Sequence, residues 1–266
     1  MDIASPMSEH LFPRDQPIDA FRLGLHDIML SGWYNSETGE LAPGFPITAE
    51  DVVVDVGCGD GGITSFSARQ GAHVILADLD PDKIRQAAER LKDSPARQVD
   101  AHVTDASPLP LADGACSRVI CTEVLEHVDD PAALMSELVR VGRPGALFLI
   151  SVPGGEQETL QKSLAPPMYF EKPNHIRIFD AASFESLVES SGLVIERRLA
   201  VSFFWSMWWL FFWQANIPLG QGSHPALDAW ARTWVEVLQG RDGLRIKAAL
   251  DENMPKVRAV VARKPL

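Results

Sequence analysis

Short apolar runs alternate with amphipathic stretches along most of the chain from residue 51 onward. The segment VVVDVGCG (52–59) is rich in β-branched residues and ends in glycines, which predicts a buried parallel strand. Asp80 and Pro81 are typical of a helix start, because the aspartate caps the first turn and proline loses nothing there. The same pattern predicts further strands over 73–78, 98–103, 118–122, 146–152, 193–201 and 256–264, and helices over 61–70, 80–91, 131–141 and 180–190.

Strands that alternate with helices in this order predict an α/β fold, a Rossmann-like, doubly wound and mainly parallel sheet with helices on both faces. Three regions lie outside the alternation. Residues 1–50 are expected to form a helical lid, 153–179 has the proline and glycine content of a loop, and 202–255 is long enough for an inserted helical cap. We therefore expect a central domain made of 51–201 and 256–266.

The chain of 266 residues has 24 Lys and Arg against 36 Asp and Glu, and its formal net charge is −12. A charge of this sign repels a phosphate backbone, so nucleic acid is not an expected partner. The three cysteines are too few for a disulfide framework and suit a reducing compartment. The first ten residues, MDIASPMSEH, lack a secretory signal pattern, and we expect a cytoplasmic protein.

An uncharged segment of fifteen residues, LAVSFFWSMWWLFFW, runs from Leu199 to Trp213. As a helix it would be about 22 Å long, against about 30 Å for the hydrocarbon core of a bilayer, so no membrane span is expected. Eight of the eleven residues from Phe203 to Trp213 are Phe or Trp. Three interpretations stay open for this run: packing inside the cap, an apolar wall over a bound molecule, or peripheral contact with a membrane surface.

The end of the first strand carries the candidate chemistry. Gly57, Gly59 and Gly62 satisfy a dinucleotide-type G-x-G-x-x-G spacing, which alone is weak evidence. Asp55 and Asp60 bracket these glycines and would repel a pyrophosphate, whereas they suit a cofactor that is cationic at this point. S-adenosylmethionine, with its sulfonium and ammonium groups, fits better than a nicotinamide cofactor. The alternative is a tight turn with no ligand.

Two further carboxylates follow the next strands. Asp78 ends the second strand and is placed to accept the two ribose hydroxyls. Asp105 follows the third strand and is placed to bind the adenine amino group.

Five motifs in order resemble those of class I S-adenosylmethionine-dependent methyltransferases, with the seven-stranded sheet of that family. They are VVVDVGCGDG, the strand-end Asp78, DASPLPL (105–111), CTEVLEHV (121–128) and RPGALFLISVP (143–153), and the pattern is closest to small-molecule enzymes of the ubiquinone-biosynthesis type. The terminal VRAVVARKP resembles the last strand of the family. The resemblance implies that the cofactor is bound by Asp55, Gly57, Cys58, Gly59, Asp60, Asp78, Leu79, Asp105, Ala106 and Thr122.

The segment from Glu123 to His127, together with a later histidine, resembles the metal site of metal-dependent O-methyltransferases. Glu123, Glu126, His127 and His175 would then hold one Mg, Mn or Zn ion that lowers the pKa of the acceptor hydroxyl. Many members of the family carry EVLEHV without a metal. In that case His127 or His175 is the expected general base, and Glu123 closes the site.

These observations favour a methyltransferase that acts on a hydrophobic small molecule: a phenol or catechol, an isoprenoid or sterol, a polyketide or a lipid. We expect O-methylation before C-methylation. The alternative from another class is a non-catalytic S-adenosylmethionine-binding protein whose aromatic cap binds a partner or a membrane surface.

Overall fold

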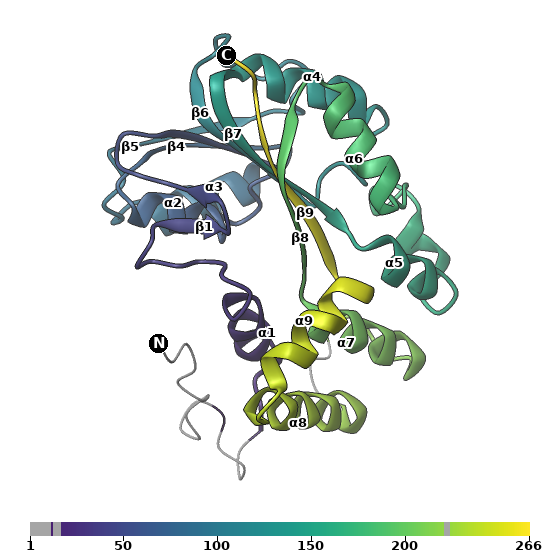
Figure 1. Ribbon diagram of the computed structural model, residues 1–266. Coiled ribbons are helices and arrows are strands. Elements are labelled where there is room, and N and C mark those ends of the chain that lie inside the picture. The colour runs from purple at the N-terminus through teal and green to yellow at the C-terminus, as the bar shows by residue number, and fades with distance from the viewer. Residues whose placement is uncertain (1–11, 13–16, 221–223) are drawn as a thin grey trace.

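A seven-stranded sheet lies at the centre of the computed structural model, which describes residues 12, 17–220 and 224–266 (Figure 1). The strand order is β5-β4-β3-β6-β7-β9-β8. Strands β3 to β7 pair in parallel, and β9 lies antiparallel between β7 and β8. The strands are β3 (Val52–Val56), β4 (His73–Asp78), β5 (Gln98–Val103), β6 (Cys116–Thr122), β7 (Gly142–Pro153), β8 (Val194–Val201) and β9 (Val257–Arg263). The predicted Rossmann-like, mainly parallel sheet is confirmed.

Helices cover both faces of this sheet, because successive residues of a buried strand point to opposite sides. Val54 packs in one core cluster with α4 (Pro131–Val141) and α6 (Ala181–Ser190). Val53 packs in a second cluster with α2 (Thr64–Arg69) and α3 (Pro81–Leu91). The capping that the sequence predicts for α3 is present, since the Asp80 carboxylate accepts a hydrogen bond from the N–H of Asp82 at 2.7 Å.

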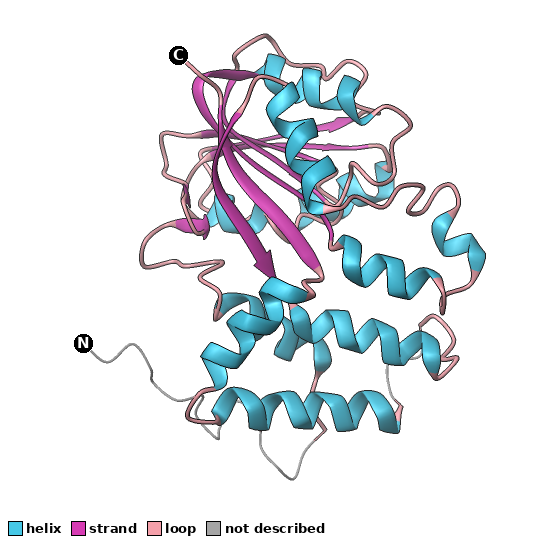
Figure 2. Cartoon of the chain, turned by 45° about the vertical axis from the view of Figure 1, so that its right-hand side comes forward, coloured by secondary structure: helices cyan, strands magenta, loops and turns pink. Residues whose placement is uncertain are grey.

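Four more helices gather at one end of the sheet and share a third core (Figure 2). They are α1 (Ala20–Met29), α7 (Phe203–Gln214), α8 (Pro225–Gln239) and α9 (Gly243–Asn253). The last three lie within 202–255, the segment predicted as a helical cap. That this segment is a domain of its own stays a prediction. Among the described residues no helix combines the length and the apolar character needed to cross a bilayer.

The prediction of a loop over 153–179 was wrong, whereas the helical character predicted for 1–50 is present in part and its role as a lid stays a prediction. The region 1–50 contains, besides α1, a short hairpin of β1 (Glu40–Ala42) and β2 (Phe45–Pro46), while 1–11 and 13–16 lie outside the described residues. The expected loop 153–179 contains α5 (Gly155–Lys162) and the 3-10 turn Pro167–Phe170. The glycine that suggested a loop is needed for close packing, because a Cβ at Gly155 would lie 2.3 Å from the carbonyl oxygen of Phe179.

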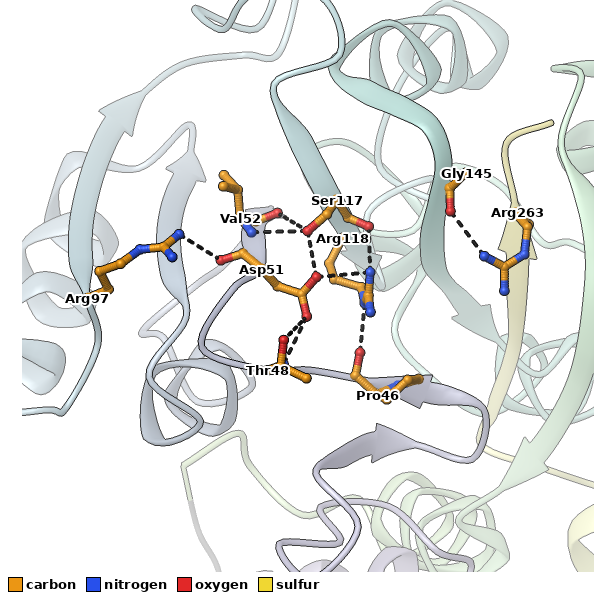
Figure 3. Close-up of polar contacts among 9 residues, drawn as sticks. All are labelled: Pro46, Thr48, Asp51, Val52, Arg97, Ser117, Arg118, Gly145 and Arg263. Atoms are coloured by element: carbon orange, nitrogen blue, oxygen red, sulfur yellow. Dashed lines mark hydrogen bonds and ion pairs between the residues drawn. The ribbon is translucent and has the colours of Figure 1, made fainter. Parts of the chain in front are cut away.

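A polar network fixes the amino ends of the central strands (Figure 3). The buried Asp51 accepts hydrogen bonds from the hydroxyl of Ser117 at 2.7 Å and from the N–H of Thr48 at 2.9 Å. Arg118 contacts the Asp51 carboxylate at 3.1 Å and donates to the carbonyl oxygen of Pro46 at 2.7 Å. This network ties β2, β3 and β6 together at one edge of the sheet and leaves the opposite, carboxyl edge for binding.

Candidate active site

The loop after β3 has two glycines with different duties. Gly57 has φ of 74°, and a Cβ there would lie 2.3 Å from Cγ2 of Val124, so glycine lets the loop after β6 pack against it. Gly59 has φ of 53°, and a Cβ there would meet no heavy atom within 4 Å. Between them, the Cys58 thiol is a free and buried side chain. Gly59 therefore borders open space in which a ligand can approach the backbone.

The two carboxylates that bracket the glycines do not act as the charge argument from the sequence expects. Asp55 is 1% exposed and accepts a hydrogen bond from the hydroxyl of Thr64, and burial raises its pKa to about 6. Asp60 forms an ion pair with Arg90 at 2.6 Å, which compensates its charge. Neither residue presents an uncompensated, exposed negative charge. Their contact with a cofactor stays a prediction.

Asp78 faces the glycine loop from the end of β4. One oxygen accepts a hydrogen bond from the N–H of Gly59 at 2.9 Å, and the other accepts from the N–H of Asp80 at 2.9 Å. A carboxylate has about four acceptor positions, so two stay available for a pair of hydroxyls. Leu79, the next residue, is 71% exposed, which places an apolar side chain beside this carboxylate.

The other predicted cofactor residues lie at the same edge of the sheet. Ala106 has φ of 59°, and its N–H donates a hydrogen bond to the hydroxyl of Thr104 at 3.0 Å. The exposed Asp105 accepts a hydrogen bond from the N–H of Ser107 at 3.0 Å. Thr122 ends β6, which pairs directly with β3. The open space at Gly59, the free acceptor positions of Asp78 and this shared edge fit S-adenosylmethionine.

A second group of side chains follows β6. Ligand atoms of Glu126, His127 and His175 all lie within 4.8 Å of one another. The Glu126 side chain is 1% exposed, and neither carboxylate oxygen has a hydrogen-bond partner. Burial first, and then the charge of Glu123, raises the pKa of Glu126 well above its usual value. Three of the four predicted metal ligands therefore come together, whereas Glu123 instead accepts a hydrogen bond from the hydroxyl of Ser151 at 2.9 Å.

Both histidines of this cluster are oriented through Nδ1. His127 Nδ1 lies 3.1 Å from the carbonyl oxygen of Pro173, and His175 Nδ1 lies 2.7 Å from Oε2 of Glu158. The two rings meet edge to face with centroids 4.9 Å apart. An oxygen acceptor at Nδ1 places the hydrogen on that nitrogen and leaves the lone pair of Nε2 free to bind a proton or a metal. Burial lowers the pKa of His127, which favours its neutral form.

The buried Glu158 of α5 links this cluster to a lysine. Its Oε1 lies 3.4 Å from Nζ of Lys256, the residue just before β9, while its Oε2 contacts His175. Burial acts to raise the pKa of Glu158, but the hydrogen bond from His175 and the charge of Lys256 lower this pKa below its usual value. Burial acts to lower the pKa of Lys256, but the charges of Glu123 and Glu158 raise this pKa above its usual value. Glu158 and Lys256 thus form a buried ion pair beside the histidines.

An apolar cavity of about 830 Å³ opens between α1, α7 and α8 and reaches Lys256. Trp205, Trp208 and Trp209 of α7 form one wall, while the buried Phe204 of the same helix packs in the core. The aromatic run therefore serves both as packing and as a cavity wall. Its contact with a membrane surface stays untested.

Residues 54–150 match a family model described as "Methyltransferase domain". A probable S-adenosylmethionine-dependent methyltransferase of Mycolicibacterium smegmatis is 32% identical over 149 residues, which are 56% of this chain and 54% of that protein. A ubiquinone biosynthesis O-methyltransferase of Xylella fastidiosa is 38% identical over 100 residues, 37% of this chain and 40% of that protein. The crystal structure of the cyclase SpnF covers 82% of this chain and 77% of its own, with a TM-score of 0.57 and 20% identity.

Residues 54–150 of the chain therefore match a methyltransferase domain, and the chain is similar over a longer stretch to a probable S-adenosylmethionine-dependent methyltransferase. The matches span about half of the first curated relative and two fifths of the second. The likeness to SpnF concerns the fold alone, and a fold by itself does not fix the reaction.

The methyltransferase domain match includes the glycine loop and the segment from Glu123 to His127, but it ends at residue 150. Glu158, His175, Lys256 and the residues that line the aromatic cavity lie outside the matched segment, some before it and some after it. The sequence predicted His175 and missed Glu158 and Lys256. Glu158 was missed because 153–179 was interpreted as a loop. Lys256 was missed because the direction of the last strand was not predicted. Since β9 is antiparallel, its first residues lie at the carboxyl edge of the sheet, where Val257 pairs with Pro153.

Proposed function

We propose that this protein transfers a methyl group from S-adenosylmethionine to an oxygen atom of a hydrophobic small molecule. The observation that carries the proposal is the aromatic cavity, whose inner end meets the pair of Lys256 and Glu158 beside the two histidines. The acceptor classes considered are a phenol or catechol, an isoprenoid or sterol, a polyketide and a lipid. The cavity supports each of them by its apolar walls, and the nearby histidines suit an acceptor hydroxyl because either could take its proton.

The residues that would hold the cofactor are those at the carboxyl ends of β3 to β6. The backbone at Gly57 and Gly59 borders the methionine end, Asp78 accepts the ribose hydroxyls, and Asp105 with Ala106 borders the adenine. When bound there, S-adenosylmethionine supplies a methyl carbon that is activated by a positively charged sulfur. The chain mainly contributes alignment, which is worth up to about 7–11 kcal/mol in well-oriented reactions.

His175 is our first candidate for the general base. Its Nδ1 is held by the buried Glu158 at 2.7 Å, so Nε2 can take the proton of an acceptor hydroxyl. The negative Glu158 stabilises the imidazolium that results. His127, whose Nδ1 is held by a backbone carbonyl, is the second candidate. Tyr169 packs its ring against both His175 and Trp213, which connects the base to the cap.

A divalent metal ion is the second candidate for activating the hydroxyl. The supporting observation is that both oxygens of the buried Glu126 lack a hydrogen-bond partner, while ligand atoms of Glu126, His127 and His175 lie within 4.8 Å of one another. A nitrogen and oxygen ligand set of this kind suits Mg, Mn or Zn, and the carboxylate of Glu158 on His175 is a typical outer-shell contact. Such an ion would lower the pKa of the acceptor hydroxyl.

A screen of labelled methyl transfer tests the proposed activity. Wild-type protein is incubated with methyl-labelled S-adenosylmethionine and with quinols, sterols, isoprenoid alcohols and fatty acids in turn. We expect labelled product with at least one class, and loss of that product in His175→Ala. Tight cofactor binding without labelled product in any class would instead support the non-catalytic binding protein. Flotation with liposomes in parallel tests the membrane contact of the cap, which absence of co-flotation would exclude.

The metal branch has its own measurement. Wild-type protein stripped with a chelator is titrated with Mn²⁺, Zn²⁺ and Mg²⁺ by calorimetry, next to Glu126→Gln and to Glu156→Gln as an exposed control. We expect one ion per chain in the wild type and the control and none in Glu126→Gln. Full activity in the presence of chelator, or equal ion binding in all three proteins, would remove the metal from the mechanism.

A further inference from the structure

Lys256 is a buried charge in the lining of a mainly apolar cavity. Its side chain is 12% exposed, whereas Asp19 and Asp228, the other charged residues that line the cavity within the described part of the chain, are exposed. Phe21 and Leu219 also line the cavity and are 77% and 69% exposed, so they mark its mouth. A molecule that enters past Phe21 with its polar end first therefore meets Lys256 as its innermost charged group.

The ammonium of Lys256 has donors to spare. A lysine ammonium carries three N–H donors. Within the part of the chain that the structure describes, the acceptor of Nζ is Oε1 of Glu158 at 3.4 Å, which is long for a hydrogen bond between charged groups. At least two donors are thus available to an oxygen atom that arrives through the cavity. Because Glu158 contacts His175 through its other oxygen, such an oxygen would lie next to the candidate base.

The charges around the Lys256 ammonium favour a neutral hydroxyl over a carboxylate as the oxygen group that binds there. Glu158 already neutralises Lys256, so a carboxylate at the same ammonium would meet the repulsion of a second buried negative charge. A neutral hydroxyl avoids this cost on binding. A phenol has a pKa of about 10, far below that of an aliphatic alcohol. The positive charge of Lys256 therefore stabilises a phenol most when its O–H bond ionises. The Trp side chains of the wall also favour an aromatic ring.

We propose that Lys256 selects the methyl acceptor by donating a hydrogen bond to a phenolic hydroxyl whose apolar body fills the aromatic cavity. This inference rests on the proposed function and names its substrate class. Lys256 is in this view a specificity-determining residue, and its ammonium sets which end of the acceptor points to His175. The apolar substituent of the phenol then extends toward Phe21 and Leu219.

Ligand binding in the absence of cofactor tests this inference separately from turnover. The cavity wall contains Trp205, Trp208 and Trp209, so quenching of tryptophan fluorescence reports occupancy directly. The probes are 4-heptylphenol, its methyl ether 4-heptylanisole, 4-heptylbenzoate and 4-heptylcyclohexanol. In the wild type we expect the phenol to bind more tightly than each of the other three probes.

The variants are Lys256→Met, Lys256→Arg and, as a control outside the cavity, the exposed Lys162→Met on α5. Lys256→Met should weaken the phenol by roughly tenfold or more and leave the anisole unchanged, because a hydrogen bond from a charged donor is lost. Lys256→Arg should keep most of the affinity for the phenol, and Lys162→Met should match the wild type.

Three results would overturn the assignment. They are equal affinity of the wild type for phenol and anisole, a benzoate that binds more tightly than the phenol, and an equal loss of phenol and anisole binding in Lys256→Met. The first two need no variant, so the inference stays falsifiable if Lys256→Met does not fold. Absence of methyl transfer with a phenol that binds as expected would count against the proposed activity and not against the binding role of Lys256.

Discussion

Single side chains at the carboxyl edge of the sheet act on the backbone as well as on a ligand. Asp78 accepts the N–H of Gly59 and of Asp80, so the same carboxylate shapes the loop and offers its other acceptor positions to hydroxyls. Glu158 works in a similar way, since one oxygen orients His175 and the other contacts Lys256. An alanine variant at one of these positions should therefore be compared with a conservative substitution at the same position and with a control that removes an equal charge elsewhere.

Replacing Asp78 with alanine should weaken S-adenosylmethionine binding by about 10–100-fold, because hydrogen bonds to a charged acceptor are worth roughly 1.5–3 kcal/mol. Asp78→Asn keeps one oxygen acceptor and should lie between the wild type and the alanine variant. Calorimetric titration with S-adenosylmethionine and S-adenosylhomocysteine measures the affinities. Asp82→Ala, an exposed change of equal charge on α3, should bind like the wild type. A folded Asp78→Ala protein with wild-type affinity would contradict the ribose assignment.

Asp27 predicts a specific pH dependence of stability. It is fully buried, accepts a hydrogen bond from Trp234 at 2.8 Å and shares the Lys247 ammonium with Asp251. Burial first raises the pKa of Asp27 from 3.8 to about 6. The folded state therefore holds this proton more strongly than the unfolded state, and the free energy of unfolding falls as pH rises from about 4 to about 6.

The test compares the wild type with Asp27→Asn in urea unfolding between pH 4 and pH 7. Asn cannot ionise, so the wild type should lose about 2 kcal/mol relative to the variant across this window. Asp55, whose pKa is also raised to about 6, titrates in both proteins and cancels from the difference. Asp93→Asn, at an exposed position, should follow the wild type. A constant difference between wild type and Asp27→Asn would show that the carboxyl titrates normally.

At the scale of single elements, α7 separates two duties along one apolar helix. Phe204 is fully buried in the core, whereas Trp209 is half-buried at the cavity wall and stacks on Trp213 with centroids 5.9 Å apart. Phe211, also half-buried, contacts Trp230 and does not line the cavity. Trp209 and Phe211 thus form a matched pair of aromatic positions with different expected roles.

Trp209→Ala should raise the dissociation constant or the Michaelis constant of an apolar acceptor by about 3- to 10-fold, because aromatic contacts of roughly 0.5–1.5 kcal/mol are lost together with apolar area. Phe211→Ala should leave ligand binding unchanged at a comparable loss in Tm. Fluorescence titration and thermal unfolding give the two readouts. If both variants change stability alone, α7 is packing and the cavity wall has no binding role.

At the scale of the whole molecule, α1 joins the N-terminal region to the helices at the end of the sheet. Trp205 of α7 lies against Gly24, where a Cβ would come within 2.1 Å of the indole Nε1. Asp27 of α1 accepts a hydrogen bond from Trp234 of α8, which connects these two helices. The docking of α1 therefore positions one wall of the cavity as well as the cap.

Gly24→Ala should lower the free energy of unfolding by about 1–3 kcal/mol, since overpacking at a close contact forces Trp205 to move. Because Trp205 lines the cavity, the affinity for the phenol probe should change as well. Thermal unfolding and fluorescence titration measure both effects. Leu25→Ala, on the same helix at a side chain 52% exposed, should change neither. Wild-type stability in Gly24→Ala would show that α1 does not pack on the cap in solution.

The sequence by itself determined the order of elements and the cofactor edge of the sheet. Hydrophobic period, β-branched runs and helix caps such as Asp80 are local signals, so β4, β5 and α4 begin and end where they were predicted. The strand-end residues Asp78 and Thr122 meet at one edge because parallel strands bring their carboxyl ends together.

The tertiary structure alone decided what faces the acceptor and which charges are compensated. The pairing of Asp60 with Arg90 spans 30 residues, and that of Glu158 with Lys256 spans 98, so no local pattern records them. The antiparallel direction of β9 and the packing of α1 on α7 place Lys256 and the tryptophans around one cavity. Contacts between distant segments depend on how the layers pack, and that information is spread over the whole chain.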